Sequence, residues 1–245
     1  MAQSHIAIIA DVHANIWALD AVLKDIRQRG IQTIINLGDS LYGPLAPEET
    51  AERILSEHLL NIQGNEDRIL FEESASPSLT VLFVRDVLPA KYLQWLRSLA
   101  TSAVLDDLFA CHGTPHSDET YLLENPSAQG SSLKSSQQIT ALLGPIPQCF
   151  ILCAHSHLPR TVLLPDGRLI INPGSVGLSA YQDDLPFPHK METGSPHARY
   201  ALLSRDAESY SVSHLLIPYN WQQAAETARK NGRADWAMWL EEGRA

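Results

Sequence analysis

The sequence predicts an α/β fold, and three features of its pattern carry that prediction. Short β-branched apolar runs alternate with amphipathic helical segments through the first third of the chain. Their order, strand, helix, strand, helix, strand, predicts a parallel sheet whose ligands gather beyond the carboxyl ends of the strands. Hairpin patterns in the later part predict antiparallel strands as well. No internal repeat or linker divides the 245 residues, which favours a single domain over residues 1–245.

Five elements are expected in the first third. Each strand is an apolar, β-branched run, and each helix has apolar residues on one face. Gly30 is placed to end the first helix and Pro47 to begin the second. In chain order we expect a strand at 5–10, a helix at 15–29, a strand at 31–37, a helix at 47–58 and a strand at 59–63.

The rest of the chain alternates less regularly. Residues 67–98 have a helical pattern that Pro77 and Pro89 interrupt. The stretch 179–198 is expected to be an ordered excursion, with residues 181–184 as a candidate lid, because loops this long are usually functional or disordered. The remaining expected elements are strands at 107–113 and 148–157, a short helix near 135–143, hairpins turning at Asp166-Gly167 and near Arg205-Asp206, and C-terminal helices from about 220, at 220–231 and 234–242.

Composition excludes several classes of protein. Apolar residues make up 44% of the chain, enough for a sizeable core, and the formal net charge of -10 argues against nonspecific nucleic-acid binding. No apolar run reaches the roughly 18 residues of a membrane span, and no signal peptide is visible. The cysteines Cys111, Cys149 and Cys153 lie in apolar runs, so we interpret them as reduced core thiols of a cytoplasmic protein.

Polar side chains gather where the predicted strands end. Asp11 and His13 follow the first strand, and side chains two residues apart in an extended segment point the same way. Similar motifs follow later strands: Gly38-Asp39, Gly64-Asn65-Glu66-Asp67, Cys111-His112-Gly113 and Ala154-His155-Ser156-His157. Each motif alone is more often a turn or a core residue. Their common position at strand ends predicts a metal site.

The candidate ligands are carboxylates, imidazoles and one amide: Asp11, His13, Asp39, Asn65, His112, His155 and His157. Such a set, without thiolates, suits Mn, Fe, Zn, Co or Ni better than calcium. Seven ligands are too many for one tetrahedral site, but they suit two adjacent sites that share a carboxylate. Two divalent ions roughly 3.5–4 Å apart can lower the pKa of a bridging water and clamp the oxygens at phosphorus. Phosphoester hydrolysis is the natural use of that arrangement.

The ordered motifs Asp-x-His, Gly-Asp-x-x-x-Gly, Gly-Asn, His-Gly and His-x-His resemble the calcineurin-like metallophosphoesterase superfamily, especially its small stand-alone prokaryotic members of diadenosine tetraphosphatase or phosphodiesterase type. The resemblance extends from His5 through the turn at residues 172–177. It implies a four-layer α/β/β/α sandwich of two mixed β-sheets. It also implies ligand roles: Asp11, His13 and His157 for one metal, Asn65, His112 and His155 for the other, with Asp39 bridging them.

The resemblance further implies a di-metal phosphoesterase that hydrolyses a small phosphodiester or nucleotide-type phosphoester by attack of a metal-bridging hydroxide. Asn65, Glu66 and His112 would be its catalytic residues. Arg160, three residues after His157, is the first candidate to bind a substrate phosphate through its guanidinium, although a surface ion pair is the commoner role. The expected partner is a small-molecule substrate, with no stable nucleic acid and no membrane.

Two residues depart from the family pattern. Ala154 stands where a glycine is usual, which is a minor steric change, and Glu66 stands where most members have a histidine that assists the leaving oxygen. A carboxylate acts as a general acid only if its pKa is raised, and two nearby metals favour the opposite shift. We therefore expect poor turnover of monoesters with poor leaving groups. A catalytically weakened scaffold, a nucleotide-sensing protein and a protein serine/threonine phosphatase remain alternatives.

Overall fold

The structure is a computed structural model that describes residues 4–128, 130–206 and 208–245. Its strands are β1 (Ser4–Ile9), β2 (Thr33–Asn36), β3 (Leu59–Asn61), β4 (Ser102–Leu105), β5 (Leu108–Cys111), β6 (Glu124–Ser127), β7 (Gly130–Leu133), β8 (Phe150–Leu152), β9 (Arg160–Leu163), β10 (Leu169–Asn172), β11 (Ala180–Asp183), β12 (His189–Glu192), β13 (Ala198–Arg205) and β14 (Tyr210–Ile217). Its helices are α1 (Ile16–Gln28), α2 (Pro47–Leu55), α3 (Asn65–Ile69), α4 (Leu79–Val87), α5 (Ala90–Ser98), α6 (Ser136–Leu143), α7 (Trp221–Lys230) and α8 (Ala234–Glu242).

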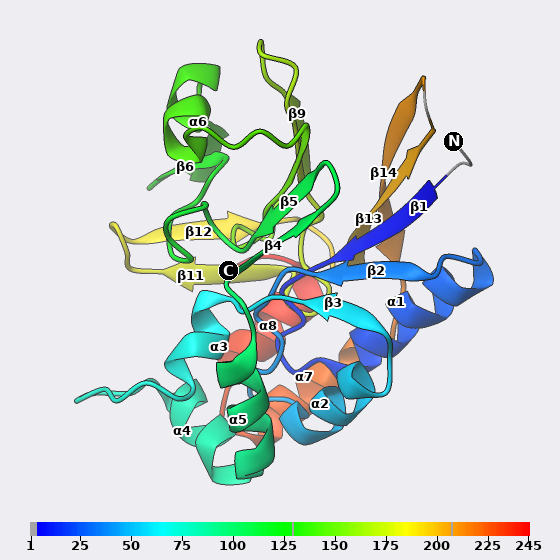
Figure 1. The fold of residues 1–245 in the computed structure, drawn as a ribbon. Coiled ribbons are helices and arrows are strands. Elements are labelled where there is room, and N and C mark those ends of the chain that lie inside the picture. The colour runs from blue at the N-terminus through cyan, green and yellow to red at the C-terminus, as the bar shows by residue number, and fades with distance from the viewer. Residues whose placement is uncertain (1–3, 129, 207) are drawn as a thin grey trace.

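Within these residues the strands form two five-stranded mixed sheets (Figure 1). The first has the order β14-β13-β1-β2-β3, in which β1, β2 and β3 are parallel. β13 pairs antiparallel with β1, and β14 pairs antiparallel with β13. The second has the order β4-β5-β8-β10-β9, with its three central strands parallel and its two edge strands antiparallel. The strand, helix, strand, helix, strand order at the start of the chain is thereby confirmed.

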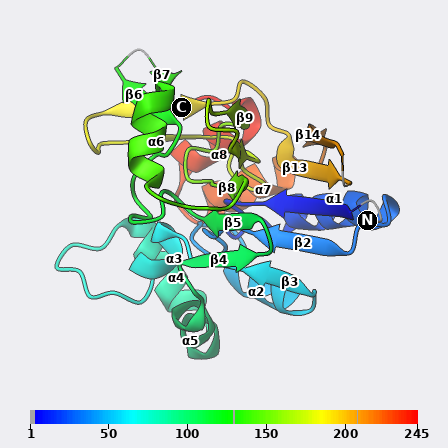
Figure 2. The ribbon, with the colours of Figure 1, turned by 45° about the horizontal axis from the view of Figure 1, so that its top comes forward.

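Burial of apolar side chains on both faces of each sheet produces four layers. Ile8 and Ile35 of the first sheet pack against Leu152 and Ile171 of the second, which forms a core between the sheets. The outer face of the first sheet packs on helices, with the apolar face of α1 at its centre. The outer face of the second sheet packs on α6, which Figure 2 shows beside β5 and β8. The α/β/β/α sandwich is confirmed.

Local signals explain most element boundaries. Asn15 begins α1 by accepting a hydrogen bond from the Ala18 amide, and Ser78 begins α4 in the same way through the Val81 amide. The helical stretch at 67–98 is three helices, α3, α4 and α5, with the prolines between them. The hairpin at Asp166-Gly167 joins β9 to β10 as expected. The strand β4 and the hairpin β6–β7 were not expected, because β4 is only four residues long and the strands of the hairpin are short and mostly polar.

The stretch at 179–198 is ordered as the hairpin β11–β12. The terminal helices α7 and α8 pack beside it, with Trp236 and Leu240 buried against Leu178 and Ala180 (Figure 1). One cysteine prediction is wrong: Cys149 is exposed, because it precedes β8 at the sheet boundary, whereas the other two cysteines are buried. In the described part of the chain no helix is long and apolar enough to cross a membrane.

Candidate metal centre

The candidate ligands lie in loops where strands of both sheets end. The loops after β1 and β2 are joined by backbone hydrogen bonds, from the Asp11 amide to Gly38 O and from the His13 amide to Asp39 O, each 3.0 Å long. The loops of the second sheet are joined similarly, from the Ala154 amide to His112 O at 2.7 Å. Because each loop is bound to its neighbour, side chains far apart in sequence are held at one edge of the sandwich.

Five of the ligands have left-handed backbone conformations. The φ angles are +53° for Asp11, +50° for His13, +53° for Asp39, +69° for His155 and +58° for His157. Non-glycine residues rarely adopt this region, and each such residue costs on the order of 1–3 kcal/mol when the surrounding structure enforces it. The sequence argument that Asp11 and His13 converge as alternate residues of a strand is therefore wrong. The strand ends at Ile9, and sharp turns direct the side chains inward.

Asp11, His13 and His157 form the first group. The Nε2 atoms of the two histidines are 3.0 Å apart, and His157 Nε2 is 3.8 Å from Asp11 Oδ1. His13 Nδ1 donates to Tyr42 O at 2.9 Å and His157 Nδ1 donates to Leu178 O at 2.8 Å. Because a carbonyl only accepts, both Nδ1 atoms carry the proton, so in the neutral rings both Nε2 atoms present lone pairs to each other. That contact is favourable only with a cation between them.

Both carboxylate oxygens of Asp11 are buried and have no hydrogen-bond partner among the described residues. A buried carboxylate without partners is costly unless it binds a cation. Burial raises the pKa of Asp11 well above its ordinary value, with Asp39 adding to the rise. Burial also lowers the pKa of His13 and, by more, that of His157. These residues therefore fit a divalent metal ion, which would stabilise the ionised carboxylate and the neutral imidazoles together.

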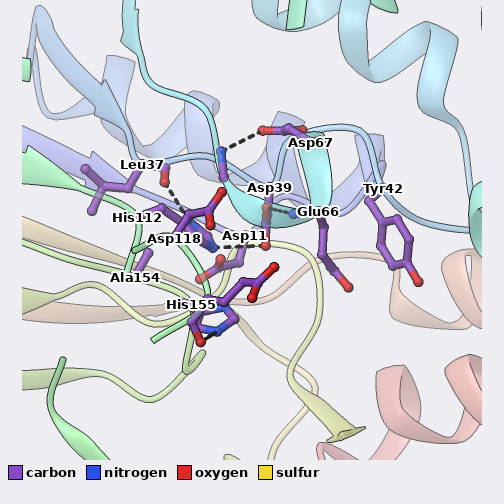
Figure 3. A network of polar contacts seen from close by, with 12 residues as sticks. Asp11, Leu37, Asp39, Tyr42, Glu66, Asp67, His112, Asp118, Ala154 and His155 are labelled. Atoms are coloured by element: carbon purple, nitrogen blue, oxygen red, sulfur yellow. Dashed lines mark hydrogen bonds and ion pairs between the residues drawn. The ribbon is translucent and has the colours of Figure 1, made fainter. Parts of the chain in front are cut away.

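Asp39, His112 and His155 form the second group (Figure 3). His112 Nδ1 donates to Leu37 O at 2.8 Å, and its Nε2 lies 3.1 Å from Asp39 Oδ2. His155 is oriented the other way: its Nε2 donates to Glu119 O at 3.0 Å, which leaves Nδ1 free. Such bonds to carbonyls are the usual way in which proteins fix the tautomer of a ligating histidine.

In the second group, the protonation states of Asp39, His112 and His155 depend on one another. Burial opposes the charged form of His112, but the carboxylate of Asp39 raises the pKa of His112 to about 10. Burial likewise opposes ionisation of Asp39, yet His112 holds the pKa of Asp39 well below its ordinary value. Burial and the neighbouring His112 lower the pKa of His155 to about 4. Asp39 is thus an ionised acceptor that faces a positive charge, which a metal ion can supply in place of the proton.

Asn65 and Glu66 begin α3 beside these groups. Asn65 Oδ1 is buried without a hydrogen-bond partner in the described residues, and the Glu66 amide donates to Asp39 Oδ1 at 2.8 Å. Gly64 permits this approach, because a Cβ there would lie 2.1 Å from Asp39 Oδ1. Asp67, to which the sequence assigned no role, fixes the turn by accepting from the amides of Ser40 at 2.8 Å and Leu41 at 3.2 Å.

The Glu66 side chain extends toward Tyr42 and the open side of the site (Figure 3). Its Oε2 is 3.3 Å from His13 Nδ1, and the side chain is 27% exposed. Burial and the carboxylates of Asp39 and Asp11 raise the pKa of Glu66 well above its ordinary value in the metal-free protein. Two divalent ions would act in the opposite direction.

A cavity of about 970 Å³ is lined by five of the seven candidate ligands, His13, Asp39, Asn65, His155 and His157. Aromatic residues form one wall, with Trp236 packed edge-on to His13 at 5.8 Å between ring centroids and Tyr42 beside Trp236. The hairpin β11–β12 also lines the cavity, through residues 181–183 and 185–187. The prediction that residues 181–184 act as a lid is therefore compatible with their position.

The structure does not bring Arg160 to this cavity. Its guanidinium binds Glu124, with Nε 2.8 Å from Oε1, and it lines a separate cavity of about 520 Å³. The cations that do line the metal cavity are Lys134 and Arg233, which sequence reasoning missed. Lys134 follows an unpredicted hairpin and Arg233 begins a C-terminal helix, so no local motif marked them.

The two-sheet sandwich thus carries groups of buried carboxylates and imidazoles that could hold metal ions. Residues 5–187 match the calcineurin-like phosphoesterase superfamily domain, so the chain belongs to that superfamily and is a phosphoester hydrolase.

Two further similarities cover nearly the whole chain. The chain is 26% identical over 262 aligned positions to an uncharacterized protein of Methanocaldococcus jannaschii, covering 96% of each chain. It also resembles the crystal structure of a metallophosphoesterase from Sphaerobacter thermophilus, with a TM-score of 0.77, 23% identity and coverage of 98% of this chain and 99% of that one.

Proposed function

We propose that the protein is a di-metal phosphoesterase that acts on a small phosphodiester or nucleotide-type phosphoester. The observation that carries the proposal is the continuity of the two ligand groups. Asp39 belongs to the second group, and it also lies with His13 of the first group and Glu66 in a third cluster whose donor atoms are within 4.8 Å of one another. A carboxylate between two donor sets is suited to bridging two ions.

The proposed roles divide among the buried side chains. Asp11, His13 and His157 would hold one ion, and Asn65, His112 and His155 the other, with Asp39 shared. Divalent ions, when bound, lower the pKa of a coordinated water and neutralise charge at phosphorus. Asn65 and His112 would also position the phosphoryl oxygens, and Glu66 lies at the rim, where the leaving oxygen would depart. We further propose that the ions are transition metals such as Mn, Fe, Zn, Co or Ni, because the donors are imidazoles and carboxylates.

The enclosing elements favour a small substrate. Aromatic side chains on one wall and the β11–β12 hairpin on the other rise around the ligands, so a folded protein surface would have restricted access. This arrangement supports the small-ester proposal over the protein phosphatase alternative. We also propose a cytoplasmic location, supported by the three free thiols.

Metal reconstitution tests the proposal. Protein stripped with a chelator would be restored separately with Mn, Fe, Co, Ni, Zn or Mg, and its metal content measured. Each form would be assayed on a phosphomonoester, a phosphodiester, a cyclic nucleotide and a dinucleoside polyphosphate. We expect two ions per chain and turnover of diester or polyphosphate substrates. Two bound ions without any turnover would instead support the scaffold or sensor alternatives, and a single ion would contradict the di-metal arrangement.

A further inference from the structure

The metal cavity contains two cations that are not metal ligands, Lys134 and Arg233. Arg233 is neutralised locally, because its Nη2 lies 2.7 Å from Asp235 Oδ2 and its Nε 2.9 Å from Asp235 Oδ1. Lys134 differs. Among the residues that the structure describes, no carboxylate lies within ion-pair distance of its ammonium group.

The backbone holds Lys134 in place. It directly follows β7, where its amide donates to Leu123 O at 2.7 Å. Its Nζ donates to Tyr121 O at 2.9 Å and to Glu124 O. An ammonium group has three N–H donors, so these two bonds orient it and leave one donor for another acceptor. The side chain is half-buried, so its charge is only partly solvated.

Glu124 attracts this charge but forms no ion pair with it. Its carboxylate is fully buried and receives Arg160 through both oxygens, at 2.8 Å from Nε and 3.3 Å from Nη2, as well as the hydroxyl of Ser131. Only the backbone carbonyl of Glu124 contacts Lys134. Arg160 occupies both carboxylate oxygens of Glu124, so Lys134 has no carboxylate of its own within ion-pair distance among the described residues.

Lys134 lies on the His155 side of the metal centre. The ring of Tyr121, whose carbonyl binds Lys134, stacks on the imidazole of His155 with 4.5 Å between centroids and 25° between planes. The hydroxyl of Tyr121 is also 2.8 Å from that of Tyr181 on β11. Tyr121 thus forms a rigid wall that connects the ammonium group to the second ligand group.

We propose that Lys134 forms a second anion subsite, which binds a phosphoryl group of the substrate other than the one at the metals. The proposal rests on the proposed function and narrows it to substrates with two linked phosphoryl groups, such as pyrophosphate-type esters. A lysine ammonium on a half-buried stem suits this role, since it acts as a point charge toward phosphate. The metals and Lys134 then bind different phosphoryl groups of one molecule.

Binding of two non-hydrolysable probes tests the subsite. Methylphosphonate carries one phosphoryl group, and methylenediphosphonate carries two in the geometry of a pyrophosphate. Their affinities for the metal-loaded protein would be measured by calorimetry in a buffered excess of metal, so that the chelation of each probe by free metal is the same for every protein variant. The variants are Lys134→Gln, which retains a hydrogen-bond donor without the charge, and Lys134→Arg, which retains the charge. Lys24→Ala, an exposed change on α1, controls for net charge.

In the wild type we expect methylenediphosphonate to bind about tenfold more tightly than methylphosphonate, as a charge-assisted contact predicts. Lys134→Gln should abolish that preference with little change for methylphosphonate, whereas Lys134→Arg and Lys24→Ala should preserve it. An unchanged preference in Lys134→Gln, or an equal loss for both probes, would overturn the subsite. Assays of the same proteins on the phosphoester panel described above separate the two hypotheses. Absence of turnover of every panel substrate by the wild type would reject the proposed function, and the binding result would still decide whether the subsite exists.

Discussion

His13 and His157 face each other through their Nε2 atoms, which are 3.0 Å apart although 144 positions separate the residues in sequence. Each ring is fixed by a bond from Nδ1 to a backbone carbonyl, so neither can rotate to relieve the contact without losing a hydrogen bond. The protein therefore maintains an arrangement that is unfavourable without a cation and favourable with one.

Metal removal should for this reason lower stability. Binding to the folded state alone stabilises it by about 2.7 kcal/mol when free metal is 100 times Kd. We expect the melting temperature to fall when chelator is added, and to fall much less in His157→Ala, which has lost a ligand. The exposed His58→Ala is the matched control and should behave as the wild type. A melting temperature that is insensitive to chelator in the wild type would contradict this prediction.

Gly64→Ala should damage the metal centre without a general backbone effect. Gly64 has an ordinary φ of -97°, but its new Cβ would lie 2.1 Å from Asp39 Oδ1. Relief of the overlap would displace Asp39, with an expected cost of about 1–3 kcal/mol and weakened metal binding. Gly232→Ala is the comparison, because its φ is +77° and its Cβ would meet open space. Measured metal affinity should fall in the first variant only; equal affinities would show that the site adapts.

Glu66→His should change the dependence of the rate on the leaving group. A histidine at this position can protonate a departing alkoxide, and general acids of this kind contribute about 10²–10⁴-fold. We expect the variant to gain most on monoesters with poor leaving groups and least on esters of acidic phenols. The measurement is kcat/KM across a series of aryl phosphates of increasing phenol pKa. Parallel lines for wild type and variant would refute a role for residue 66 at the leaving oxygen.

Asp25 should make stability depend on pH at a site remote from the metals. Its Oδ2 accepts from Tyr200 Oη at 2.6 Å and from Arg29 Nε at 2.7 Å, joining α1 to β13. Burial is the largest single influence and opposes ionisation, but the hydrogen bonds from Arg29 and Tyr200 and the charge of Arg29 together lower the pKa of Asp25 in the folded protein. A carboxyl with a lowered folded-state pKa contributes stability above its unfolded-state pKa, near 3.9, and loses it as the pH falls through the folded-state value.

Urea unfolding of the wild type and Asp25→Asn measures this contribution. We expect the variant to be less stable by about 1 kcal/mol at pH 7, the usual size of such a hydrogen bond. The difference should shrink as the pH is lowered below about 4, because protonation then removes the charge in the wild type too. A difference that stays constant or grows toward acid would mean that the charge of Asp25 is not the source.

The sequence was a good guide where local signals set the structure. Pro47 begins α2 and Gly30 follows the C-cap of α1, as expected, and apolar periodicity located β1, β2 and β3 to within a few residues. The sequence did not predict the short polar strands. The hairpin β6–β7 has little apolar pattern, since its strands lie outside the two main sheets, and periodicity reports only burial on one face.

By itself the sequence determined the donor set of the candidate metal centre, because carboxylate and imidazole donors at strand ends limit the possible chemistry. Only the tertiary structure decided their geometry. The left-handed turns at Asp11 and His13 depend on hydrogen bonds to the neighbouring loop, which no local pattern encodes. The tertiary structure also pairs Arg160 with Glu124, and it places Lys134 at the cavity. Whether a cationic side chain is available to a substrate depends on the residues with which it pairs, and the fold brings these residues together from distant parts of the sequence.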